Sequence, residues 1–320
     1  MAHFLARLSP RSKRLLLATL LASSVVAGLP SEARADRGLV LDKASLTAGD
    51  RQGLERAVAA ARAANPDSFR AVEEVRAEVK HRDANKRGRL AAIGPRLKEL
   101  GPGALLPMLE LLVLQAPREE VASAGLRALQ VGLLEAVGAL HDTRAESALV
   151  AMARADHADE HVGLAAARAL GRLSSDLSVV TLRGLASGSA AARRRAAAGL
   201  GACRREASVA ILAMLTKDPD EQTRELAIRS LGQVGNAQAW RTSSMLRAEE
   251  GPTRAAAAAA LVPLFVQGDA AQRAAISVAL LTIDHAETPR LLAASRDGGD
   301  GSTKAAIDRL IARFARNPAR

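Results

Sequence analysis

Two histidines and a glutamate occur together in His157-Ala158-Asp159-Glu160-His161, and their types and spacing could support chemistry. On a helix, histidines four residues apart point the same way and could bind one zinc ion. The glutamate beside them would then serve as the general base that activates a zinc-bound water. A chain that used this arrangement would be a zinc-dependent hydrolase.

This HxxEH spacing, the form found in inverted zinc peptidases, supports catalysis only inside a helix and with a third protein ligand elsewhere. Here the segment aligns with Asp218–Gln222, a turn between two repeated units. We therefore expect its acids to cap the start of a helix, and no other histidine has the spacing of a third ligand. The sequence predicts no catalytic residue, no metal ligand and no cofactor. A hydrolase using His157, Glu160 and His161 is the alternative.

A leucine with similar neighbours returns every 30 or 31 residues, at Leu140, Leu170, Leu200, Leu231 and Leu261. An alanine precedes each of these repeat leucines by four positions, so a small residue and a leucine share one helix face. A fixed period of this length indicates stacked helical units that bury their apolar faces against one another. Glycine directly follows three of the leucines, where we expect each helix to end in a left-handed residue: Gly171, Gly201 and Gly232.

A second apolar helix is predicted in each unit, over Ala145–Ala155, Leu177–Ala186, Ala207–Thr216 and, less apolar, Ala237–Ala248. Leu280 follows Leu261 by only 19 residues, so we interpret Val262–Val266 as a truncated second helix. The stack should resume through 272–283, 288–295 and a final helix over 303–316. Aromatic residues make up only 2% of the chain, so the core must consist mainly of alanine and leucine. We expect an all-α fold.

The stretch 218–232, Asp-Pro-Asp-Glu-Gln-Thr-Arg-Glu-Leu-Ala-Ile-Arg-Ser-Leu-Gly, and its weaker copies resemble HEAT repeats, in the short variety known from bilin-lyase-type repeats. The resemblance covers 119–316 and implies an α-solenoid of stacked helical hairpins. It also implies that the first helices, which carry the repeat leucines, form the convex face and the second helices the concave face. An arginine seven residues before a repeat leucine would pair with acids between units, which assigns a structural role to Arg193, Arg224 and Arg254.

Residues 1–35 are predicted to be an export signal, because basic residues precede an apolar run that Pro30 ends and Ala33-Arg34-Ala35 offers a cleavage site. An uncleaved membrane anchor is the alternative. Residues 36–118 are interpreted as an N-terminal cap with degenerate repeats, including helices over 52–63, 67–81, 86–100 and 104–115. A separate partner-binding arm is the alternative there. Residues 317–320 form a C-terminal tail.

The net charge is +11, of which residues 1–35 contribute +4. This surplus permits anionic partners, although an exported protein is not expected to bind nucleic acid. The densest basic cluster, residues 193–205, is expected to form a solvated convex face, with binding of an acidic surface as the alternative. Cys203 and Trp240 are predicted to be buried in the core.

We therefore expect a non-enzymatic scaffold, periplasmic or secreted, that binds a protein or peptide on its concave face. The locally polar segment Thr242-Ser243-Ser244 is where we expect that partner first. No stable membrane span is expected after signal cleavage. The sequence does not indicate an oligomeric state.

Overall fold

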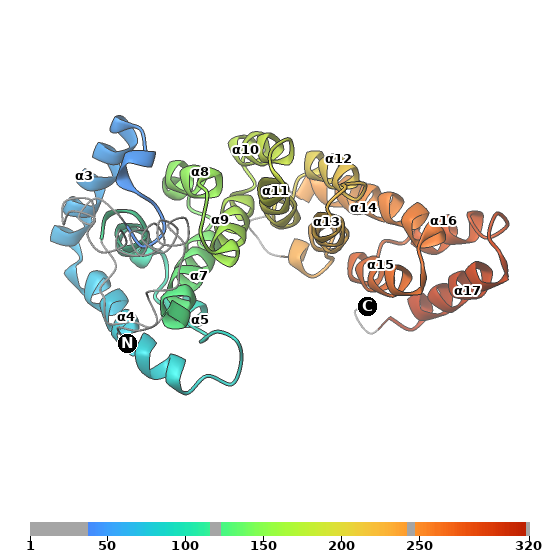
Figure 1. Cartoon of the computed structure of the whole chain (residues 1–320), viewed down its shortest axis with the longest axis horizontal. Helices are drawn as coiled ribbons and strands as arrows, with labels where there is room; N and C mark the ends of the chain where they lie inside the picture. The colour runs from blue at the N-terminus through green and yellow to red at the C-terminus, as the bar shows by residue number, and fades with distance from the viewer. Residues whose placement is uncertain (1–37, 116–122, 242–246, 318–320) are drawn as a thin grey trace, which may run out of the picture.

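The computed structural model describes residues 38–115, 123–241 and 247–317, and this part of the chain is helical with no β-strand. From residue 123 onward, helices alternate between two layers that arch across the molecule (Figure 1). The first helices of successive units are α7 (Ser123–Ala139), α9 (Glu160–Leu173), α11 (Ala190–Ala202), α13 (Glu221–Val234) and α15 (Ala270–Ile283). The second helices are α8 (Glu146–Arg154), α10 (Asp176–Ala186), α12 (Glu206–Leu215), α14 (Arg247–Gln267) and α16 (Thr288–Ala294), and α17 (Gly301–Ala315) ends the stack. The predicted all-α solenoid is confirmed.

Each first helix packs against the next one in the row, and small residues let their backbones approach closely. A Cβ added to Gly138 would lie 2.7 Å from the Cα of Ala169, and one added to Gly171 would overlap the Gly199 carbonyl. The same relation joins Gly201 to Ser230 and Gly232 to Ala279. The first helices therefore form the tightly spaced layer of the solenoid.

These contacts show that the expected left-handed helix ends at Gly171, Gly201 and Gly232 are wrong. All three glycines lie inside helices and have negative φ angles. A left-handed residue does follow α9 and α15, but the residues are Ser174 and Asp284. Glycine is used here because it has no side chain to hold two helices apart.

The close contacts also revise the set of repeat leucines. Gly138 of α7 contacts Ala169 in the same way as Gly171 of α9 contacts Gly199, so Gly138 and Gly171 occupy equivalent positions. The residue before each glycine is then equivalent as well, which pairs Val137 of α7 with Leu170 of α9. Leu140 lies one residue beyond the end of α7. Because Gly232 meets Ala279, the residue equivalent to Leu231 in the next first helix is Leu280. The residues that share this packing position are Val137, Leu170, Leu200, Leu231 and Leu280, all fully buried.

Leu261 lies instead in α14, which packs against α12 and α16 and so belongs to the second-helix layer. The predicted second helix over 237–248 is wrong, since a 3-10 turn occupies Ala239–Arg241 and α14 begins at Arg247. The truncated helix predicted at Val262–Val266 is wrong as well, because α14 continues without a break through Pro263 to Gln267. The other three second helices lie within one residue of their predicted bounds at each end.

The N-terminal part contains α3 (Ala48–Ala64), α4 (Pro66–Ala84), α5 (Gly94–Glu99) and α6 (Leu105–Leu109), the last continued by a π-helical turn over Glu110–Leu114. The helix predicted over 86–100 is wrong except for α5. Pro95 follows Gly94 at the start of α5, and a proline at this point cannot continue a preceding helix.

An extended segment at the beginning of the described chain closes this end of the stack. The backbone N–H groups of Leu39 and Val40 donate to the carbonyl groups of Leu111 and Leu112, at 3.1 and 3.0 Å. Leu39 and Leu41 are buried in the core that continues into the repeats. The backbone of this short segment thus caps the apolar π-helical turn.

Several predictions fall outside the described residues: the export signal at 1–35, the domain boundary at 118/119 and Thr242-Ser243-Ser244. Only Asn317 of the predicted tail is described. Among the described helices, none combines the length and apolar character needed to cross a membrane.

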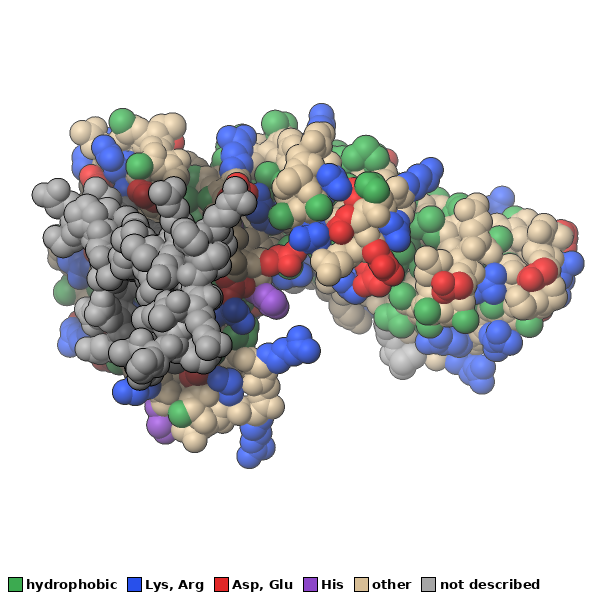
Figure 2. Space-filling model, in the orientation of Figure 1, with side chains coloured by type: hydrophobic (Ala, Val, Ile, Leu, Met, Phe, Trp, Pro, Cys, Tyr) green, Lys and Arg blue, Asp and Glu red, His purple; other side chains and the backbone are tan. Residues whose placement is uncertain are grey.

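The arch opens on the side of the first helices (Figure 1), and the space-filling view shows the hollow beneath its middle (Figure 2). The layer with the closer helix spacing lies on the inside of a curved stack, which agrees with the backbone contacts made by its glycines. The expected assignment of the second helices to the concave face is therefore wrong.

Candidate functional site

The His157–His161 segment is the turn that leads into α9. Asp159 is the N-cap residue, and its carboxylate accepts a hydrogen bond from the backbone N–H of His161 at 2.9 Å. Glu160 is the first residue of the helix, while His157 precedes it. The two histidines therefore do not share a helix face. The predicted position of the segment, at the start of a helix with an acid as its cap, is confirmed.

The imidazole of His157 is engaged by the backbone of the preceding second helix. Its Nε2 lies 2.6 Å from the carbonyl oxygen of Met152, so Nε2 carries the proton and donates. Burial lowers the pKa of His157, and the nearby Arg195 charge lowers it further against the raising effect of the Met152 hydrogen bond. His157 is thus a neutral structural donor.

This histidine substitutes for an arginine that other units carry. Seven residues before the packing position, α11, α13 and α15 carry Arg193, Arg224 and Arg273, whereas α9 carries Gly163. A Cβ added to Gly163 would lie 3.1 Å from the His157 ring, so the glycine leaves the room that the ring occupies.

The three arginines hydrogen bond to the turn or helix end that precedes their own helix. Arg193 donates to the Gly188 carbonyl at 2.8 Å, and Arg224 donates to the carbonyls of Asp218 and Pro219. Arg273 donates to the carbonyls of Phe265 and Val266. Each contact satisfies carbonyl groups that a helix end or turn leaves without a helical partner.

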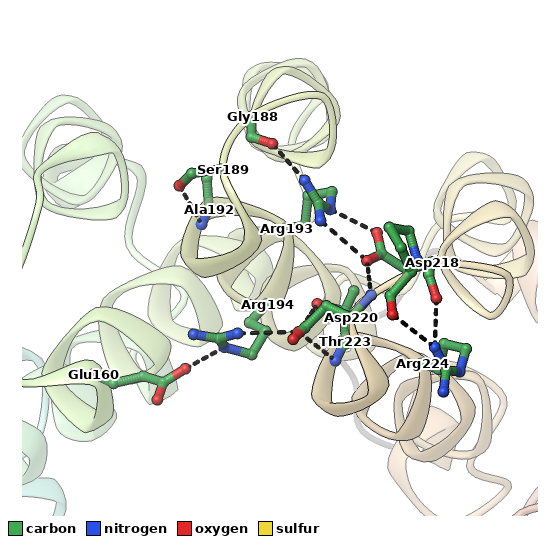
Figure 3. Close-up of polar contacts among 11 residues, drawn as sticks. Glu160, Gly188, Ser189, Ala192, Arg193, Arg194, Asp218, Asp220, Thr223 and Arg224 are labelled. Atoms are coloured by element: carbon green, nitrogen blue, oxygen red, sulfur yellow. Dashed lines mark hydrogen bonds and ion pairs between the residues drawn. The ribbon is translucent and has the colours of Figure 1, made fainter.

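Arg193 also pairs with an acid of the next unit, as the resemblance implied. Its guanidinium forms two hydrogen bonds with the buried Asp218 carboxylate, at 2.6 and 3.1 Å (Figure 3). Arg224 and Arg254 do not follow that expectation. Arg224 bonds to carbonyl groups, and Arg254 bonds to Glu250 of its own helix and to the carbonyls of Ile283 and Asp284 at the end of α15.

Arg194 joins three first helices through acids at their starts. It contacts Glu160 at the start of α9 and, at 3.0 Å, Asp220, the N-cap residue of α13 (Figure 3). The carboxylate of Asp220 also accepts hydrogen bonds from Thr223. The positive charge of Arg194 is thus compensated by two carboxylates.

The prediction that residues 193–205 form a solvated basic face is therefore wrong for most of this cluster. The side chains of Arg193, Arg194 and Arg195 are only 22%, 19% and 7% exposed. Arg205 pairs with Asp176 and Glu249. These charges are used inside and between the units. The sequence did not reveal this role because the acidic partners lie 25 to 44 residues away in the chain.

Cys203 and Trp240 are fully buried, as predicted. The indole N–H of Trp240 donates to the Val234 carbonyl at 2.8 Å, so its polar group is satisfied in the core. Burial raises the pKa of the Cys203 thiol. Among the described residues, no three His, Cys, Asp or Glu side chains are placed to hold a metal ion.

Together, the two helical layers and the polar contacts between units define an α-solenoid. Residues 180–262 match the family model for HEAT repeats, and this stretch of the chain consists of such repeats. No curated protein matches the chain.

Proposed function

We propose that this protein is a non-enzymatic scaffold that binds another protein or a peptide along the concave, first-helix face of its solenoid. HEAT repeats support an interaction role. One observation carries the proposal: the side chains that could have formed a zinc site make structural contacts instead. His157 donates a hydrogen bond to the Met152 carbonyl, and Glu160 forms an ion pair with Arg194 of the next unit.

A rigid curved surface binds by many weak contacts spread over several units. The concave face offers such a surface, including a groove of about 310 Å³ between α13 and α15 with Ile228 and Ala275 in its lining. The lining combines three apolar side chains with charged side chains of both signs, which suits a polypeptide partner.

Capture from cell-envelope extracts tests the proposal with a matched pair of variants. Ala275→Trp fills the concave groove, while Ala210→Trp adds the same bulk to the exposed side of second helix α12. We expect Ala275→Trp to lose a partner that the wild-type protein and Ala210→Trp retain. Loss with Ala210→Trp alone, or no partner with any of the three, contradicts the proposal.

The zinc-dependent hydrolase is tested separately by metal analysis of the purified protein. Stoichiometric zinc that disappears in His157→Ala would favour the hydrolase over the scaffold. The structural role of His157 predicts that zinc content is unchanged by this substitution.

We further propose that the chain is exported to the periplasm or secreted, on the basis of its first 35 residues. The mass of the protein from a periplasmic fraction should correspond to a chain that begins at Asp36. A full-length mass in a membrane fraction would support the uncleaved anchor instead.

A further inference from the structure

One residue of each first helix, two positions before the packing residue, lies in a row across the concave face. The close contacts between helices fix this alignment. The row consists of Glu135, Arg168, Ala198, Arg229 and Val278. Ala198 is fully buried between two arginines, while Arg229 and Val278 are 59% and 60% exposed. The row therefore places an arginine on either side of a buried alanine.

Arg168 stands out within this row. It is half-buried, and its guanidinium makes no hydrogen bond or ion pair with any residue in the described part of the chain. Burial lowers its pKa, and the charges of Arg172 and Arg229 add to this effect, with Glu135 opposing it. A guanidinium without a direct protein acceptor keeps its five N–H donors available to a ligand.

Two further arginines extend the positive region at the ends of α9 and α11. Arg172 donates to the Glu135 carbonyl oxygen at 2.9 Å, and Arg204 donates to the Ala202 carbonyl oxygen at 3.2 Å. The Nε of Arg204 is buried without a hydrogen-bond partner. Burial lowers the pKa of both arginines, and the charge of Arg172 also lowers that of Arg204.

The acids near these four arginines compensate only part of their charge. Glu135 is the acid that raises the pKa of Arg168 and of Arg172 against the lowering effect of burial. Glu225 lies 3.5 Å from Arg229, and both side chains are about 60% exposed. An exposed pair of this kind contributes little binding energy and is easily replaced by a ligand. This part of the concave face thus has spare guanidinium donors.

We propose that the face formed by Arg168, Arg172, Arg204 and Arg229 binds an acidic segment of a polypeptide partner, with Arg168 and Arg229 pairing with its carboxylates over Ala198. This inference rests on the proposed scaffold function and specifies the chemistry of its partner. The planar guanidinium fork fits a carboxylate through two parallel hydrogen bonds. Because Ala198 is fully buried, its side chain does not project between the two arginines.

The neighbouring surface favours a polypeptide over a nucleic acid. The row contains no aromatic residue on which the bases of a nucleic acid would stack. The groove beside Arg229, between α13 and α15, has Ile228 and Ala275 in its lining and would accept an apolar side chain of the same segment. Glu221, Glu225 and Asp269 also line it and would exclude a carboxylate from the groove. Alternating acidic and apolar groups are found in polypeptides.

The test measures binding of a fluorescein-labelled decamer of glutamate by anisotropy in 50 mM and 150 mM salt. We expect Arg168→Glu–Arg229→Glu to weaken binding at least about tenfold, and Arg168→Gln–Arg229→Gln to weaken it by a smaller factor. The matched control is Arg154→Glu–Arg183→Glu, which changes the net charge equally on exposed positions of second helices α8 and α10. Circular dichroism establishes that each variant retains its helices.

Equal loss of binding in the control pair would mean a general charge effect and would overturn the inference. Absence of binding by the wild-type protein would overturn it as well, as would tighter binding of a thymidine decanucleotide. If an envelope partner is captured equally by wild-type protein and Arg168→Glu–Arg229→Glu, the scaffold function stands and the acidic-segment inference fails. If neither captures a partner while decaglutamate binds, the scaffold function fails instead.

Discussion

Gly171 of α9 lies directly against Gly199 of α11, so closely that a Cβ on the first would overlap the carbonyl group of the second. We expect Gly171→Ala to push the two helices apart and to lower the free energy of unfolding by about 1–3 kcal/mol. Urea denaturation followed by circular dichroism measures this loss.

Gly184 provides the control for that substitution. It lies in α10, and a Cβ there would meet nothing within 4 Å. Gly184→Ala should therefore raise the unfolding free energy by about 0.5–1 kcal/mol, since alanine favours the helix. Equal destabilisation by both substitutions would contradict the close-packing role of Gly171.

The Arg193–Asp218 pair should stabilise the junction between two units. Asp218→Asn leaves an amide that cannot pair two oxygens with the guanidinium, so we expect a loss of about 1.5–3 kcal/mol. Asp156→Asn is the control, because the Asp156 side chain is 97% exposed and should contribute almost nothing. Comparable losses from the two substitutions in a denaturant titration would refute this role for the pair.

Protonation of His157 should destabilise the fold. Since burial lowers its pKa in the folded state, the unfolded chain binds more protons once the pH falls below about 6.5. Stability is therefore complete above that pH and falls as the pH drops toward the folded-state pKa, at no more than about 1.4 kcal/mol per pH unit for this one proton. His141 and His285, whose pKa values are also lowered chiefly by burial, add to the same trend.

Unfolding titrations between pH 7.5 and 5.5 test this effect of His157. His157→Gln should show a shallower loss of stability than the wild-type protein. His161→Gln should behave as wild type, because the His161 side chain is 63% exposed. An unchanged pH dependence in His157→Gln would show that its imidazole does not titrate with folding.

Trp240 is the sole tryptophan of a chain without tyrosine, so it reports on one place in the solenoid. Its full burial predicts blue-shifted emission and weak quenching by acrylamide in the native protein. Trp240→Phe removes the hydrogen bond to Val234 and leaves unfilled volume, and we expect a loss of about 1–3 kcal/mol. Strong quenching of the native protein would place the indole outside the core.

The sequence predicted the helical class and three of the second helices because apolar periodicity is a local property. It did not predict which layer a helix joins. Leu261 follows an alanine by four positions, as Leu231 does, yet its helix packs against α12 and α16. The true equivalent is Leu280. Both leucines follow an arginine by seven positions, Arg273 before Leu280 and Arg254 before Leu261, so this local pattern did not distinguish them.

In the candidate site, too, local features could be predicted from the sequence and contacts between units could not. The capping role of Asp159 could be predicted from residue type and position at a turn. The substitution of His157 for a repeat arginine could not, because it depends on the space left by Gly163 and on a carbonyl of the preceding helix. Likewise, Arg168 and Arg229 become neighbours in a row only after the packing of α9, α11 and α13 is known.

The extended segment that covers the π-helical turn has a consequence for assembly. Repeat arrays with an uncovered terminal unit can add further copies end to end and grow into filaments. Here the N–H groups of Leu39, Val40 and Leu41 already occupy the carbonyls of Leu111 and Leu112, and leucine side chains seal the apolar surface beside them. We therefore expect that a further copy of the chain does not dock on these carbonyl groups, because the protein's own backbone already occupies them.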